Sequence, residues 1–314
     1  MTMAYQGRFL VGTVISQTFT AFFSKLLPFG GFALIGFIPT MIFLGGYFYF
    51  IFYVLGFSGF PGFDGTGQPF GSGQPFNPRD MSDLPWGWII TAFVVDMIAS
   101  IATTAIWLAA TSYGAFQYLR GQPVRFWASL RRGVSVALPC IGATFLISLV
   151  LMVVSGIVAI PLFLLIDQAE ADTPGVLFTV LFMFLTFIFV FTGFIFIICR
   201  MWVAIPTIAV ERPGVLAALR RSWDLTRGHA MRVFGIMLVM WAGTMGASVA
   251  AGIVVFIAII AIGGIAGLVI GQGLNILVSL LANALYAIAA AVSYVELRRA
   301  KEGFGIEDIA AVFD

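Results

Sequence analysis

The sequence contains few charged residues, which make up 10% of its 314 positions. In a soluble globular domain this share is usually about 25%, so the composition excludes a water-soluble globule. Apolar residues make up 61% of the chain, and its mean hydropathy is +1.06. Several uncharged runs are each long enough for at least one membrane span of about 20 residues; they cover residues 26–63, 133–166, 173–199 and 233–295. We therefore predict an all-α, polytopic membrane protein.

Residues that usually carry catalysis or bind metals are also scarce. The chain has a single histidine, His229, and it contains no phosphate-binding loop, no metal-ligand cluster and no nucleophile next to a base. Cys140 and Cys199 fall where we expect the cytoplasmic ends of spans, so no disulfide framework is predicted. The N-terminus lacks a basic segment and a clear cleavage site, so we expect no cleavable signal peptide. We predict that the protein is not an enzyme and binds no cofactor or metal.

The distribution of charge predicts six spans. Residues 233–295 fit two long spans joined by a turn near 263–273, although three short spans would also fit. With six spans, every lysine and arginine except Arg79 lies on one side of the membrane, and the opposite turn at 167–172 holds only acidic charges. The positive-inside rule then places both termini in the cytoplasm, and we expect the bacterial cytoplasmic membrane. The first four spans are 29–57, 86–118, 139–166 and 176–200.

Between the first two spans, residues 58–85 are rich in glycine and proline, which argues against a regular element. An irregular solvated loop is the main interpretation of this segment. A docking surface built from its repeated aromatic, proline and glycine residues is the alternative.

Three further segments have the amphipathic pattern of helices that lie on a membrane surface. Residues 8–27 have one apolar and one polar face and are expected to end near Pro28. The alternative for them is a first transmembrane span, which would invert the topology. In residues 120–137, apolar side chains oppose Arg125, Ser129 and Arg132.

The third amphipathic segment lies in residues 206–232, around which we expect the chain to be organised. Its helix is predicted to begin at Pro213, because proline is well suited to a first helical turn. Leu216, Leu219 and Trp223 then share one side. The other side carries Arg220, Asp224 and Arg227.

The order of these segments predicts a threefold internal repeat, in which each unit is a surface helix followed by two spans. The second and third units are the most alike, since S-L-R-R-G at 129–133 matches A-L-R-R-S at 218–222. We therefore expect a single membrane domain over residues 1–314. Its repeat-like units are 1–118, 119–206 and 207–297, followed by a cytoplasmic tail, 298–314.

Asp96 is the one acidic residue well inside a predicted span, roughly 15 Å along the helix from Trp86. A carboxylate at this depth is a candidate functional group. We expect Asp96 to form a hydrogen bond with Asn283 of the last span, either as part of a proton or solute path or as an ordinary contact between helices. Further polar residues form stripes on the two helices: Ser100, Thr103, Trp107 and Thr111 on the first, and Asn275, Ser279, Tyr286 and Ser293 on the second.

Residues 206–232 resemble the signature of the membrane domain found beside glycerophosphodiester phosphodiesterases. The residues that carry the resemblance are Pro206, Val210, Glu211, Gly214, Ala218, Leu219, Arg221, Ser222, Leu225, Thr226, Gly228 and Arg232. The tail Y-V-E-L-R-R-A-K-E-G-F extends it. The resemblance implies a six-span domain that also occurs as a separate bacterial protein, while the family's chemistry belongs to a soluble metal-dependent barrel. With one histidine and no room for a barrel, this chain is not expected to hydrolyse phosphodiesters.

Together these observations predict a non-catalytic membrane protein that contacts lipids or acts as a scaffold for partner proteins or for further copies of itself. A transporter or lipid-moving protein using Asp96 is the alternative. Nucleic acid is not an expected partner, because arginine clusters beside spans ordinarily set topology and bind anionic headgroups. The candidate headgroup contacts are Arg125, Arg131, Arg132, Arg220, Arg221 and Arg227. His229 is expected at the interface, with a catalytic or pH-sensing role as its alternative.

Overall fold

The computed structural model describes residues 9–49, 86–167, 173–262 and 264–303, which are helical apart from short connections. Ten helices are found in these residues. They are α1 (Val11–Ser24), α2 (Leu26–Tyr49), α3 (Trp86–Leu119), α4 (Phe126–Ser135), α5 (Ala137–Asp167), α6 (Thr173–Met201), α7 (Ala204–Glu211), α8 (Val215–Thr226), α9 (Ala230–Ile262) and α10 (Gly264–Glu302).

Five segments of the described chain are long and apolar enough to cross a membrane, or six if the bent pair formed by α1 and α2 counts as one span. The all-α, polytopic membrane architecture predicted from composition is therefore confirmed. The predicted bounds of 86–118 and 176–200 agree closely with α3 and α6. The loop at 58–85, the acidic turn beyond Asp167 and the chain after Gly303 lie outside the described residues.

The first amphipathic segment is separate from the span that follows it, because α1 and α2 meet at an angle of 91°. Val14, Thr18 and Phe22 form the buried face of α1, in agreement with the predicted pattern. The break lies at Lys25 rather than near Pro28. Pro28 instead occupies the first turn of α2, where a helix needs no backbone N–H from it.

Helix α10 is the centre of the fold. It packs against α1, α2, α3, α7, α8 and α9, and residues 287–298 are buried without interruption. Alanine at positions 287, 289, 290 and 291 lets the neighbouring helices approach closely. The expectation that the chain is organised around residues 206–232 was therefore wrong, since these residues form a layer over the end of α10.

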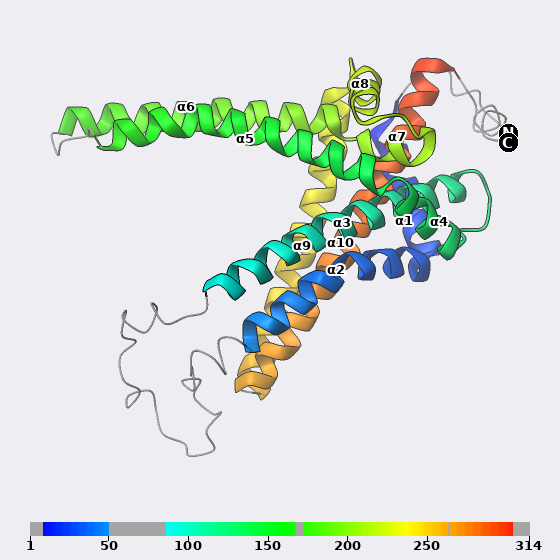
Figure 1. Ribbon diagram of the computed structural model, residues 1–314, viewed down its shortest axis with the longest axis horizontal. Helices are drawn as coiled ribbons and strands as arrows, with labels where there is room; N and C mark the ends of the chain where they lie inside the picture. Colours follow the sequence, from blue (N-terminus) through cyan, green and yellow to red (C-terminus); the bar gives the residue numbers. More distant parts are fainter. Residues whose placement is uncertain (1–8, 50–85, 168–172, 263, 304–314) are drawn as a thin grey trace.

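The α5–α6 hairpin diverges from the other long helices, as Figure 1 shows. Among the side chains described on this hairpin, the buried apolar ones are Cys140, Ala143 and Cys199. All three lie close to the ends where the hairpin joins α4 and α7. The described side chains farther along the hairpin include many exposed leucine, valine and phenylalanine residues, as expected of helices that face lipid.

Helix α7 was missed by the sequence analysis. Its residues 204 and 206–210 are buried, partly in a small core with Ala105, Cys140 and Ala218. A buried eight-residue helix with apolar residues on all sides has no amphipathic pattern that would reveal it. Helix α8 begins at Val215 after the N-cap Gly214, so the predicted start at Pro213 was two residues early.

The predicted surface helix at 120–137 is shorter in the structure, where α4 spans Phe126–Ser135 after an irregular connection. At Gly133, α4 lies directly against the backbone of α3. A Cβ at this position would overlap the carbonyl oxygen of Ile106, so only glycine permits this close approach. The S-L-R-R-G motif thus contains a position where the packing requires glycine.

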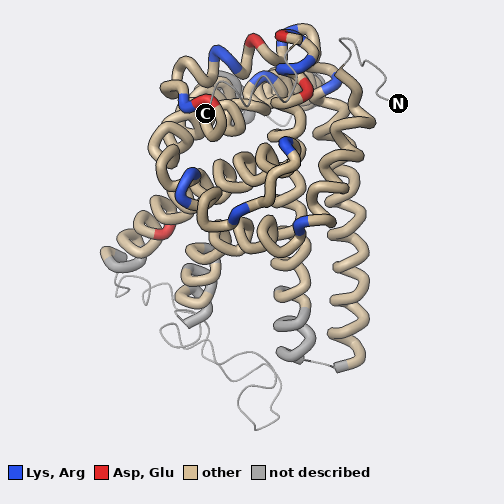
Figure 2. Tube along the Cα trace, turned by 90° about the vertical axis from the view of Figure 1, so that its right-hand side faces the viewer, with Lys and Arg blue, Asp and Glu red and all other residues tan. Residues whose placement is uncertain are grey.

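Lysine and arginine residues gather towards one end of the molecule (Figure 2). We call this region the basic end; it comprises α1, the connection 120–125, α4, α7, α8 and residues 293–303. The described basic residues of the chain lie here or next to it, at the ends of α6 and α9. The clustering expected from the charge pattern is therefore present in three dimensions.

We expect Gly133→Ala to destabilise the protein by about 1–3 kcal/mol, because the added methyl group forces α4 away from α3. The measurement is the unfolding free energy in detergent. Gly193→Ala in α6 is the matched control, since no heavy atom lies within 4 Å of its Cβ position. The control should be neutral or stabilising by up to about 1 kcal/mol. Equal losses in the two variants would contradict the packing explanation.

Candidate functional site

The predicted hydrogen bond between Asp96 and Asn283 is not formed. Helices α3 and α10 pack together as expected, but they bury their contact nearer the basic end, around Ala110, Phe116 and Ile288. Asp96 is partly exposed on the half of α3 where Phe93, Val95 and other large apolar residues are also exposed. Of the polar residues near it, Ser100 and Thr103 are partly buried, and the Thr103 hydroxyl donates to carbonyls of its own helix.

Among the described residues, no hydrogen bond joins the polar stripe of α10 to the polar stripe of α3. Asn275 is exposed, and Ser279 and Asn283 are partly buried. Closer to the basic end, the Trp202 indole N–H donates to the Ser293 hydroxyl at 3.2 Å, and the Trp202 ring packs edge-on against Tyr286. Tyr286 and Ser293, the stripe residues nearest the basic end, therefore contact the connection between α6 and α7. The structure does not assemble one intramembrane polar site from the two helices.

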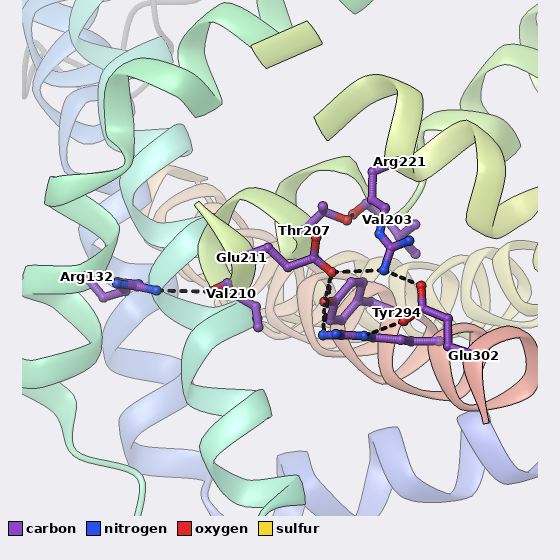
Figure 3. Close-up of polar contacts among 9 residues, drawn as sticks. Arg132, Val203, Thr207, Val210, Glu211, Arg221, Tyr294 and Glu302 are labelled. Carbon is purple, nitrogen blue, oxygen red and sulfur yellow. Dashed lines mark hydrogen bonds and ion pairs between the residues drawn. The ribbon is translucent and has the colours of Figure 1, made fainter. Parts of the chain in front are cut away.

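A different polar cluster joins α7, α8 and α10 at the basic end (Figure 3). The carboxylate of Glu211, the last residue of α7, accepts a hydrogen bond of 2.6 Å from the Tyr294 hydroxyl. Its Oε1 atom also lies 3.4 Å from Nη2 of Arg221 and 3.5 Å from Nη1 of Arg298. One carboxylate oxygen therefore connects three helices.

Glu302 completes the cluster from the last turn of α10. Its Oε2 accepts a hydrogen bond of 2.8 Å from Nε of Arg298, one turn earlier in the helix, and its Oε1 pairs with Arg221. Two carboxylates thus balance two guanidinium groups. Arg298 and the two glutamates are largely shielded from solvent, with exposed fractions of 11% and 19%, whereas Arg221 is 32% exposed. Burial opposes the charged form of Arg221, but the carboxylates of Glu211 and Glu302 outweigh it and raise its pKa.

Arg132 of α4 binds the end of α7 on the side away from the Glu211 cluster. Its Nε donates to the carbonyl oxygen of Ala209 at 2.9 Å, and its Nη2 donates to that of Val210 at 3.1 Å. These carbonyls belong to the last turn of α7, where no helical partner is available and a positive charge is favourable. Helix α7 is therefore fixed between Arg132 and the Glu211 cluster.

The cluster of Glu211, Arg221, Tyr294, Arg298 and Glu302 joins α7, α8 and α10, and we call it the clasp. Each of its carboxylates is paired with guanidinium groups, and no group of three or more metal-ligating side chains occurs in the described part of the chain. The sequence analysis missed the clasp because its partners lie far apart in the chain. The spacing of Arg298 and Glu302 by four residues was the one local signal.

The six candidate headgroup arginines fall into two groups. Arg132 and Arg221 point into the protein and bind α7 and the clasp carboxylates. The other four are exposed at the surface of the basic end: Arg125, Arg131, Arg220 and Arg227. In both R-R pairs, 131–132 and 220–221, the first arginine is exposed and the second is bound internally.

His229 lies between α8 and α9, with its ring edge-on to Phe9 at a centroid distance of 5.7 Å. Its Nδ1 atom is buried and has no hydrogen-bond partner among the described residues. Burial lowers the pKa of His229. An interaction with the Arg227 backbone opposes this shift, but burial together with the positive charges of Arg232 and Lys301 outweighs it. The lowered pKa favours the neutral imidazole, and the interfacial position expected from the sequence stays a prediction.

We expect Glu211→Gln to reduce the unfolding free energy by about 2 kcal/mol, because it removes a charged acceptor from shielded guanidinium partners. Denaturation of the detergent-solubilised protein measures this loss. Asp224→Asn is the matched control, since Asp224 is exposed and its carboxylate forms no hydrogen bond or ion pair with a described residue. The control should change stability by less than about 0.5 kcal/mol. A similar loss in both variants would mean that the clasp adds no stability.

The midpoint of the His229 titration should lie below the ordinary histidine value of about 6.5. Because the folded protein disfavours the imidazolium form, the unfolded chain binds this proton more readily, and folding stability falls as the pH drops through about 6.5. Nuclear magnetic resonance of labelled histidine measures the midpoint without assignment, since the chain has one histidine. A peptide of residues 226–232 serves as reference, and a midpoint at or above that of the peptide would contradict the prediction.

Comparison with known proteins gives one informative result. A family model described as a family of unknown function (DUF7544) matches residues 13–298. A search of curated proteins finds no match, and neither does a search of solved structures. The resemblance to the membrane domain of glycerophosphodiester phosphodiesterases therefore stays a prediction. Since the matched residues include all ten helices apart from short pieces at the two ends, the chain belongs to the DUF7544 family.

Proposed function

We propose that this chain is a non-catalytic integral membrane protein that acts through contact with anionic lipids at its basic end. One observation carries the proposal: exposed apolar side chains alternate with exposed arginines on the short helices there. Trp127 is 77% exposed and Leu216 is 64% exposed, although both are large and apolar. Such side chains gain free energy by entering the acyl boundary of a membrane.

The apolar and basic residues of these helices are spaced one helical turn apart. On α4, Arg131 follows Trp127 by four residues, and on α8, Arg220 follows Leu216 by the same interval. Arg227, the C-cap of α8, follows Trp223 by four residues. Residues four apart lie next to each other on a helix surface. Each pair can therefore place its apolar group among acyl chains and its guanidinium among phosphates.

The charge distribution supports an orientation with the basic end on the cytoplasmic side of the bacterial inner membrane and both termini there. Anionic headgroups attract basic segments next to the membrane by about 1 kcal/mol per lysine or arginine. A scaffolding role towards a protein partner or a second copy of the chain is compatible with this proposal. The exposed helices would then present a surface already held at the membrane.

Transport or lipid movement through an intramembrane carboxylate is the alternative function. It depends on α3 and α10 sharing one polar face around Asp96. The contacts of Tyr286 and Ser293 with Trp202 instead direct part of the α10 stripe towards α6 and α7. The surface of the basic end therefore supports lipid contact better than it supports transport.

The triple variant Arg131→Gln, Arg220→Gln, Arg227→Gln should lose several-fold in the enrichment of phosphatidylglycerol around the protein, because it removes three positive charges next to the headgroups. The measurement is quantitative lipid analysis of protein extracted with its surrounding lipid from vesicles of mixed phosphatidylcholine and phosphatidylglycerol. The corresponding triple lysine variant keeps the charges and should retain the enrichment. Equal enrichment in the glutamine variant and the wild type would refute the electrostatic part of the proposal.

A further inference from the structure

A pocket of about 370 Å³ lies at the basic end between α3, α4 and the end of α7. Three arginines line it: Arg120 after α3, Arg132 of α4 and Arg212 after α7. Its neutral polar lining comes from Tyr113 and Gln122, and no carboxylate contributes. Its size is in the range of small-molecule sites, which begins at about 300 Å³. The pocket is therefore strongly electropositive and suited to an anion.

The guanidinium groups of this pocket have unused hydrogen-bond donors. Those of Arg120 and Arg212 form no hydrogen bond or ion pair with any residue that the structure describes. Arg132 uses two of its N–H groups on the α7 carbonyls, and a guanidinium group has five. In the clasp, by contrast, every arginine is paired with a carboxylate. Only an anion from outside the described chain would balance the charge of the pocket.

The walls of the pocket are held in place without a ligand. Arg120 lies over the Phe116 ring at 5.4 Å, and Arg132 lies over the Tyr113 ring at 5.3 Å. The connection that carries Arg120 and Gln122 is fixed by the buried Gln117. The side-chain oxygen of Gln117 accepts hydrogen bonds from the Arg125 N–H and the Ser129 hydroxyl, both at 3.2 Å. Arg120 and Arg132 therefore need little ordering when a ligand binds, whereas the exposed side chains of Gln122 and Arg212 become ordered on binding.

The backbone of Arg212 is further evidence that its side chain is needed here. Arg212 has φ 57° and ψ 36°, the left-handed conformation that glycine and asparagine adopt most readily. It also precedes Pro213, a position that favours extended backbone. An arginine is held in this unfavourable conformation at the edge of a pocket that already contains two others.

We propose that this pocket binds a phosphate group carried by a phosphate monoester or diester. Guanidinium groups match phosphate oxygens in charge and in bidentate geometry, and three of them converge here. The ligand is either the headgroup of an anionic phospholipid or a soluble phosphate compound. The lipid source rests on the proposed function, because it requires the basic end to lie in the headgroup layer.

The test compares wild-type protein with the double variant Arg120→Gln, Arg212→Gln in phosphate-free detergent solution. Inorganic phosphate is titrated calorimetrically in one arm. In the other arm, native mass spectrometry counts the phosphatidylglycerol molecules that stay bound. We expect one saturable site in the wild type and a loss of affinity of at least about tenfold in the double variant, since charge-assisted hydrogen bonds are lost. Neither guanidinium forms a hydrogen bond or ion pair with a described residue, and the double variant loses only the contact of Arg120 with the Phe116 ring, so it should melt close to the wild-type temperature.

The double variant Arg131→Gln, Arg220→Gln is the matched control, because it removes two exposed arginines outside the pocket. It should keep the bound phosphate group even if it lowers the general enrichment of anionic lipid. Binding of inorganic phosphate indicates a soluble ligand, and retention of one phosphatidylglycerol without it indicates a lipid. Both results support the site if they disappear with Arg120 and Arg212. No saturable binding in either arm, or equal binding in the pocket variant, overturns the proposal whatever the fate of the lipid-contact function.

Discussion

The contact between the Glu211 carboxylate and the Tyr294 hydroxyl is the interaction on which the arrangement of the basic end depends. Tyr294 lies in the fully buried segment of α10, and Glu211 ends the buried helix α7. Their hydrogen bond ties the layer of short helices to the central helix of the fold. Arg221 brings α8 to the same carboxylate, and Arg132 holds α7 from the side of α4. These contacts position α7 and α8, while α4 is also held against α3 at Gly133.

The long helices could be predicted well, whereas the short buried ones could not. Composition and long apolar segments were sufficient for the membrane class and for the bounds of α3 and α6, because each signal extends over many residues. The break between α1 and α2 was placed three residues late, since proline is compatible with a first helical turn as well as with a helix end. Helix α7 lacks an amphipathic pattern because the protein surrounds it. Its detection required knowledge of tertiary contacts.

The sites show a similar division. The exposed arginines at 125, 131, 220 and 227 could be identified from their place beside the spans, because unpaired charge is tolerated only at the surface. Residues 132 and 221 look the same in sequence, yet both are used inside the protein. Nothing local distinguishes them, since their partners come from α7 and α10. The hydrogen bond expected between Asp96 and Asn283 is not formed, for a related reason. The depth of each residue along its helix could be estimated from the sequence, but the rotation of each helix about its own axis could not.

Because the α5–α6 hairpin diverges from the other long helices, the surrounding bilayer can influence how the hairpin is tilted. Near the basic end the hairpin is fixed by buried contacts around Cys140, Ala143 and Cys199, whereas the described side chains farther along it have little protein to pack against. Contacts near the basic end set its inclination, and because little protein packs against the rest, the fit of its apolar length to the hydrocarbon layer adds a further influence. A thinner membrane favours a more tilted hairpin, and a thicker one a more upright hairpin. Because α5 and α6 end beside α4 and α7, such a change in tilt is transmitted to the layer that carries the exposed arginines.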